Sequence, residues 1–192
     1  MKEEDLRIFE EIAGITEKSV LADALACELA RYSVYDIMKM RARLDSETNQ
    51  LPPPYRENVR PYFIEWQIGR YMKLMEMRSN GGFHGLTGTI ENLELYREFC
   101  AMETRRLKEW DETEQDEDDW YNPFHSRYYL LLSCFYMFVL REPGHPVGMP
   151  FPGGFTVEKR TDGIYCPIRD KEKDVEYSIC NFCPARQDEN NK

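Results

Sequence analysis

The chain has 192 residues, which suits one globular domain with room for a small appended module. Its 25 basic and 35 acidic residues give a net charge of -10. Phosphate binding needs clustered lysine and arginine side chains, so this balance predicts no nucleic-acid partner. The same charge disfavours an anionic membrane surface.

The distribution of apolar residues predicts neither a signal peptide nor a membrane-spanning segment. Residues 1–5 are charged and carry no apolar run with a small-residue cleavage site, so no signal peptide is expected. The longest apolar stretch, residues 128–140, is 13 residues long, whereas a bilayer span needs about 20. We therefore expect a cytoplasmic protein whose six cysteines are reduced thiols or metal ligands.

Apolar residues recur at helical spacing through most of the first 142 residues. The pattern predicts helices over 4–13, 17–44, a segment starting between 55 and 61 and ending at 77, 89–110 and 122–141. A run with seven acids in nine residues, 111–119, is expected to form a solvated loop. The predicted fold class is mainly α, with a bundle of four or more helices as a first domain over 1–142.

The composition changes at residue 143. Residues 143–154 contain four Pro and four Gly, which disfavours both helix and strand. Residues 155–160 and 164–168 then predict a small β-hairpin across Thr161-Asp162-Gly163. We expect residues 143–192 to form a Pro/Gly-rich loop, a hairpin and a cysteine-bearing cap that packs on the bundle.

Two sets of residues on the helices carry structural expectations. Two charged residues, Arg70 and Glu103, interrupt apolar stripes, and this favours an ion pair between helices. The apolar run near residue 135 is expected to occupy the centre of the bundle, with four of its side chains buried: Leu131, Leu132, Phe135 and Val139.

Three cysteines near the C-terminus form the strongest chemical signal. The pair Cys180 and Cys183 has the two-residue spacing that lets a tight turn point both sulfurs at one ion, and Cys166 adds a third sulfur. A tetrahedral site needs a fourth ligand. His145 is the first candidate because it lies in the loop leading into the hairpin, and Cys134 is the second.

Three states of these cysteines stay open. A structural zinc site is favoured, because a cap this short has almost no hydrophobic core of its own and zinc can supply folding energy directly. An iron–sulfur cluster on the same thiolates is the second alternative, and reduced cysteines without a metal are the third.

No familiar catalytic motif occurs in the sequence, neither Gly-x-Ser-x-Gly nor His-Glu-x-x-His nor a kinase motif set. The leading functional hypothesis is a binding or assembly protein whose metal-stapled cap presents a surface to another protein. The alternative is an iron–sulfur enzyme or electron carrier that uses the same cysteines, with the helices forming a pocket.

The segment His145-Pro-Val-Gly-Met-Pro-Phe-Pro-Gly-Gly-Phe155, followed by Tyr165-Cys-Pro167 and Cys180-Asn-Phe-Cys183, resembles an uncharacterised archaeal family that is frequent in methanogens. The family is a domain of unknown function, and the resemblance is most specific over residues 145–185. It implies an archaeal cytoplasmic protein in which the three cysteines and His145 act together. It implies no activity.

Overall fold

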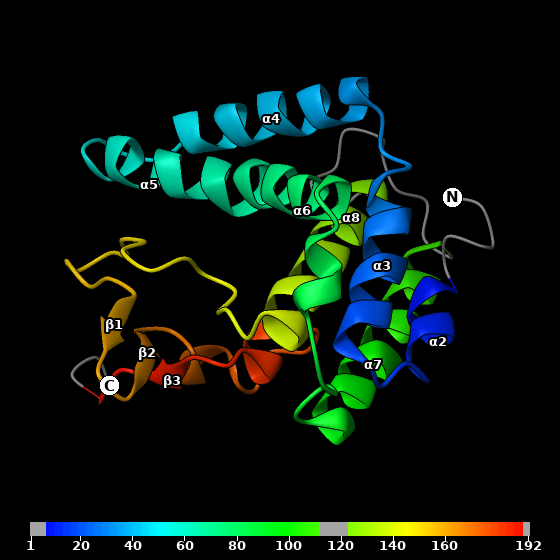
Figure 1. The fold of residues 1–192 in the computed structure, drawn as a ribbon. Helices are drawn as coiled ribbons and strands as arrows, with labels where there is room; N and C mark the ends of the chain where they lie inside the picture. Colours follow the sequence, from blue (N-terminus) through cyan, green and yellow to red (C-terminus); the bar gives the residue numbers. More distant parts are fainter. Residues whose placement is uncertain (1–6, 112–122, 190–192) are drawn as a thin grey trace.

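The computed structural model describes residues 7–111 and 123–189 (Figure 1). Within them the chain is mainly helical with a small sheet near the C-terminus, as the sequence predicts. The α-helices are α2 (Ile8–Ile12), α3 (Lys18–Leu29), α4 (Val34–Asn49), α5 (Tyr55–Ile64), α6 (Arg70–Ser79), α7 (Leu93–Asp111) and α8 (Pro123–Cys134). Most of the acidic run predicted to be a loop, and the start of the first predicted helix, lie outside the described residues.

The helix predicted over 17–44 is two helices, and this prediction was wrong. Helix α3 ends at Leu29, and α4 begins after Ser33, whose side chain accepts a hydrogen bond from the Asp36 backbone N–H. The Asp36 carboxylate in turn accepts from the Ser33 backbone N–H at 2.8 Å. This reciprocal capping box satisfies backbone donors at the start of α4, and it stabilises a helix start that apolar spacing alone does not reveal.

A single long helical rod is built from α5, a π-helical segment Glu65–Gly69 (η1) and α6. A π-helix widens the backbone turn and leaves carbonyls to be satisfied from outside the helix. Tyr128 donates its hydroxyl to the Gln67 carbonyl at 2.8 Å, and Tyr136 donates to the Arg70 carbonyl at 2.9 Å. Both tyrosines come from the last long helix, so the rod is fixed to the centre of the bundle where its turns widen.

The predicted core helix is α8 followed by a second π-helical segment, Phe135–Val139 (η3). The four side chains expected to be buried are buried, each with at most 3% of its surface exposed: Leu131, Leu132, Phe135 and Val139. Figure 1 shows α8 beside α3, with α2 lying against α7 on the outside. Phe9 of α2 meets Phe99 of α7 edge to face at 5.7 Å between ring centroids.

The sheet has three short strands, β1 (Glu158–Arg160), β2 (Gly163–Cys166) and β3 (Arg186–Gln187). The hairpin of β1 and β2 is antiparallel, as predicted, with Glu158 opposite Tyr165. The sequence pattern did not predict β3, which pairs in parallel with β2 and places Gln187 opposite Cys166. Figure 1 shows the sheet below the free end of α5, joined to the bundle by the Pro/Gly-rich loop.

The Pro/Gly-rich loop packs closely on α5. Gly148 has a φ of +86°, and a Cβ added there would lie 2.9 Å from the Tyr62 hydroxyl. Only glycine combines that backbone angle with so close an approach at low cost. Among the described residues, no helix combines the length and the apolar character that crossing a bilayer requires.

We predict that Leu132→Ala lowers the free energy of unfolding by about 2–5 kcal/mol, because the side chain is 3% exposed and its removal leaves a cavity in the core. Urea denaturation measures the change. Met38→Ala on α4 is the control, since Met38 is 64% exposed and should change stability by less than about 0.5 kcal/mol. Equal effects of the two substitutions would contradict the central position of α8.

Candidate functional site

The three cysteines singled out in the sequence lie on neighbouring segments of the cap, and all three are buried. Cys166 is the last residue of β2, whereas Cys180 lies in the short 3₁₀ turn Ile179–Phe182 (η5) and Cys183 directly follows it. The Cys183 backbone N–H donates to the Cys180 carbonyl at 3.2 Å, so the two-residue spacing forms the tight turn that was expected. Burial is the main cause that raises the pKa of Cys166 and of Cys180, and the nearby charge of Cys183 acts in the same direction on both.

Cys166 and Cys183 each open a Cys-Pro-x-Arg tetrapeptide, over residues 166–169 and 183–186. In both, backbone N–H groups of the following residues point back at the sulfur: Ile168 and Arg169 at Cys166, and Ala185 at Cys183. Burial is the larger effect and raises both thiol pKa values, while these hydrogen bonds act in the lowering direction. The two matching tetrapeptides are a signal in the sequence that the spacing of the cysteines alone does not bring out.

His145 is next to this cluster. Its Nδ1 lies 3.9 Å from the Cys166 sulfur. Its ring centroid lies 5.0 Å from that of Trp66, with the two rings tilted by 44°, and 5.3 Å from that of Phe151, edge to face. Burial, helped by the nearby charge of Arg70, lowers the pKa of His145 to about 4. The imidazole is therefore neutral at physiological pH, the form that binds metals.

Arg70 fixes the turn that carries His145. Its Nη1 donates to the Gly144 carbonyl and its Nη2 to the Pro143 carbonyl, each at 2.9 Å, while its guanidinium lies 4.3 Å from the Tyr136 ring centroid. The Gly144 backbone N–H then donates to the Cys183 sulfur at 3.4 Å. The predicted pairing of Arg70 with Glu103 is wrong, because the Pro/Gly-rich loop supplies the partners of this guanidinium.

The cluster does not reach coordinating geometry. In residues 7–111 and 123–189, no three His, Cys, Asp or Glu side chains lie close enough together to hold a metal ion. Among the four predicted ligands, Cys166 and His145 are in contact, with 3.9 Å between Sγ and Nδ1. Cys134, the second candidate for a fourth ligand, lies in another environment. Burial is the main cause that raises its pKa, and the nearby Cys100 and Glu103 act in the same direction.

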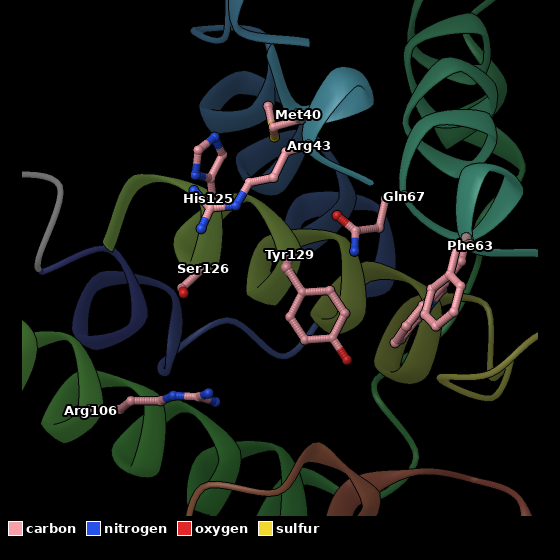
Figure 2. Close-up of a pocket in the computed structure, with 9 residues that line it drawn as sticks. Met40, Arg43, Phe63, Gln67, Arg106, His125, Ser126 and Tyr129 are labelled. Atoms are coloured by element: carbon pink, nitrogen blue, oxygen red, sulfur yellow. The ribbon is translucent and has the colours of Figure 1, made fainter. Parts of the chain in front are cut away.

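A cavity of about 210 Å³ lies between the helices (Figure 2), and Trp66, which contacts the His145 ring, is one of the residues that line it. Four helical segments build it: α4, the rod of α5 and η1, α7, and α8. Its lining is Met40, Arg43, Phe63, Trp66, Gln67, Arg106, His125, Ser126 and Tyr129. The sequence pattern did not predict this cavity, because its walls come from helices far apart along the chain.

Glu103 is a fully buried carboxyl beside the cavity. Neither of its oxygens has a hydrogen-bond partner in the described part of the chain, and its nearest cation is Arg106, with Nη1 3.6 Å from Oε2. Burial raises the pKa of Glu103 to about 8, although Arg106 acts in the lowering direction. The side chain is therefore mostly protonated at neutral pH.

The chain belongs to a family of uncharacterized proteins conserved in archaea (DUF2115), whose sequence pattern matches residues 17–188. This match spans both the helical part and the cap, so the helices and the cysteines belong to one family unit.

Relatives from methanogens are similar over nearly their whole length. The UPF0305 protein of Methanocaldococcus jannaschii is 25% identical over 86% of this chain and 93% of its own. A UPF0305 protein of Methanothermobacter thermautotrophicus is 26% identical over 91% of this chain and 98% of its own. A further alignment with a UPF0305 protein of that organism is 52% identical over 50 residues, or 26% of this chain and 32% of that protein. No solved structure matches the fold.

We predict that Glu103→Gln makes stability less dependent on pH. The unfolded chain loses the Glu103 proton near its usual pKa of about 4.3, whereas the folded protein keeps it up to about pH 8. The unfolded state therefore binds fewer protons across this window, and folding stability falls as pH rises through it. Glutamine mimics the protonated acid and removes this loss.

Urea denaturation at pH 5 and pH 8.5 measures the effect. The variant should match the wild type within about 0.5 kcal/mol at pH 5 and exceed it by at least about 1 kcal/mol at pH 8.5. Glu98→Gln, an exposed carboxyl on the same helix, is the control and should show no such difference. A Glu103→Gln variant that is less stable than wild type at pH 8.5 would contradict the assignment.

Proposed function

We propose that Cys166, Cys180, Cys183 and His145 bind one structural zinc ion, and that the protein is a binding or assembly protein whose metal-stapled cap is presented to a protein partner. The proposal is supported by the contact of the neutral His145 with Cys166, and by the hydrogen bond from the neighbouring Gly144 backbone N–H to the Cys183 sulfur. Three thiolates and one imidazole are a standard donor set for structural zinc.

The distance between Cys166 and His145 supports this donor set. Two donors on one tetrahedral zinc lie roughly 3.5 Å apart, as bond lengths of about 2.3 Å to sulfur and about 2.0 Å to nitrogen require. The separation of Cys166 Sγ from His145 Nδ1 is 3.9 Å, which needs little adjustment. Binding further requires the sulfurs of Cys180 and Cys183 to rotate inward, so the proposal includes a local rearrangement of the cap.

The surroundings suit an anionic site. Three thiolates with one Zn²⁺ carry a net charge of −1, and the charges of Arg169 and Arg70 act on Cys183. Backbone N–H groups already donate to the sulfurs of Cys166 and Cys183, which stabilises thiolates without adding charge. These groups would orient the ligands and offset the charge of the loaded site.

An exposed apolar surface supports the proposal that this is a protein-binding protein. Helix α4 presents Val34, Tyr35 and Met38 to solvent, with exposed fractions of 78%, 65% and 64%. Adjacent exposed apolar side chains of this size are typical of protein–protein contacts. Because α4 and α5 extend beyond the bundle in Figure 1, a partner could approach this surface from one side.

The alternative is an iron–sulfur cluster on the same three cysteines, which would make the protein an electron carrier or an enzyme. The observation that favours it is the set of N–H···S hydrogen bonds at Cys166 and Cys183, since such bonds tune cluster potentials. Protein purified without air would then be brown and contain iron and sulfide, whereas the zinc protein would be colourless.

We predict that the purified protein contains about one zinc per chain and that Cys183→Ser loses it, because the serine hydroxyl does not replace a thiolate ligand. Elemental analysis by mass spectrometry gives the stoichiometry. Cys27→Ser is the matched control, since Cys27 is an exposed cysteine on α3 and should leave the metal content unchanged.

Hydrogen exchange tests the structural role of the ion. A chelator should speed exchange at cap amides such as Ala185 and Gly144, while amides of α3 and α8 stay protected, because the ion supplies folding energy to the cap alone. Zinc-free protein with an equally protected cap would overturn the proposal.

A further inference from the structure

The cavity between the helices contains the side-chain amide of Gln67. This residue is 8% exposed, and Figure 2 shows its amide pointing toward the middle of the lining residues, with Tyr129 and Phe63 on either side. Its backbone carbonyl accepts a hydrogen bond from Tyr128, whereas its side-chain amide has no hydrogen-bond partner among the described residues. A buried amide needs partners for two N–H donors and one carbonyl acceptor, and a molecule bound in the cavity would supply them.

The local backbone directs this amide into the cavity. Trp66 and Gln67 both belong to the π-helical turn Glu65–Gly69, and both line the cavity. Turns of this kind are rare and occur frequently at functional sites. The Tyr128 hydroxyl lies 2.8 Å from the Gln67 carbonyl and holds the backbone of the turn. The position of the amide is therefore set by the core of the protein, while the amide itself is left for a ligand.

A second polar atom of the lining also lacks a partner. The Nδ1 atom of His125 is buried and has no hydrogen-bond partner in the part of the chain that the structure describes. Burial is the main cause that lowers the pKa of His125, so the imidazole is neutral at neutral pH. Figure 2 shows His125 on the side of Gln67 that is away from Phe63. The cavity thus has a polar edge beside an aromatic wall.

The arginines of the lining do not require an ionic ligand. Arg43 lies 3.5 Å from the Glu47 carboxylate, and Arg106 donates to the Tyr177 backbone carbonyl at 3.0 Å. Both cations therefore have partners within the protein. The two unpaired groups, the Gln67 amide and the imidazole, are neutral, and a neutral ligand matches them.

The size of the cavity limits the ligand. Its volume is about 210 Å³, somewhat more than the roughly 150 Å³ of an engineered cavity that binds benzene. It is smaller than the about 300–1,000 Å³ of pockets for drug-sized molecules. One six-membered ring with small polar substituents fits this space, and a nucleotide does not.

We propose that this cavity binds a small neutral nitrogen heterocycle that carries an N–H donor beside a carbonyl acceptor, the edge that a lactam ring presents. The Gln67 amide pairs with this edge through two parallel hydrogen bonds, as glutamine pairs with the adjacent donor and acceptor of adenine. The flat ring lies against Phe63 and Trp66. The Nδ1 atom of His125 is open to a further polar atom of the ring. The site does not depend on zinc in the cap.

Two probes on the full chain test the polar edge. The lactam 2-pyridone has the N–H beside the carbonyl, and 1-methyl-2-pyridone keeps the ring and the carbonyl but lacks the N–H. NMR titration of the Trp66 indole N–H, assigned by its loss in Trp66→Phe, gives each Kd. The lactam should bind at least about fivefold more tightly than its methyl derivative, the ratio that one neutral hydrogen bond provides. A smaller ratio, or no shift with 2-pyridone, overturns the proposal.

Gln67→Leu tests the amide. Leucine has a similar size but no donor or acceptor, so the variant should bind the two probes with a ratio below about twofold. Toluene, which has only the ring, should bind the variant at least as tightly as the wild type, because the aromatic wall is intact. Gln50→Leu is the matched control, since Gln50 is an exposed glutamine at the end of α4 that does not line the cavity. It should keep the wild-type ratio.

A second substitution covers the case in which Gln67→Leu fails to fold. Gln67→Met is unbranched like glutamine, and the same loss of preference for 2-pyridone is expected. Thermal denaturation checks that each variant unfolds within a few degrees of the wild type. A ratio that stays above about twofold without the amide, or equal losses of toluene and 2-pyridone affinity, would overturn the assignment of the polar edge to Gln67.

Discussion

The fixed point of this structure is the buried guanidinium of Arg70. It donates to the Pro143 and Gly144 carbonyls, and the Gly144 backbone N–H donates onward to the Cys183 sulfur. A buried arginine is costly unless its donors are satisfied, so this interaction holds a loop rich in Pro and Gly in one conformation. Arg70 also lies on the rod that includes α5 and α6. Its own backbone carbonyl accepts a hydrogen bond from the Tyr136 hydroxyl. The core helix, the rod and the cap therefore meet at one side chain.

The proposed zinc site and the cavity share a wall because of this arrangement. Trp66 lines the cavity and also contacts the ring of His145 at 5.0 Å. Tyr129 also lines the cavity; burial is the main cause that raises its pKa, and the charge of Cys180 acts in the same direction. A change in the position of the cap would therefore change one side of the cavity.

The π-helical turn Glu65–Gly69 has a consequence for the same region. It shifts the following helical residues by one position relative to a regular α-helix, which places Trp66 and Gln67 on the cavity while Arg70 faces the loop. A regular helix would turn these side chains to other directions. Tyr128 makes the wide turn tolerable by donating to the Gln67 carbonyl. The lining of the cavity and the contact of Arg70 with the loop thus lie next to one local departure from α-helical geometry.

The sequence alone determined the class of fold, the buried centre at residues 131–139 and the hairpin across residue 162, because apolar periodicity and turn residues are local signals. It also singled out Cys166, Cys180 and Cys183 by spacing and His145 by its place in the loop before the hairpin, and the structure puts Cys166 and His145 in contact. The tertiary structure alone decided three things: that Arg70 binds the loop carbonyls rather than Glu103, that Glu103 keeps its proton, and that a cavity lies beside Trp66. Each depends on side chains from helices distant in the chain, and no local pattern encodes which of them meet.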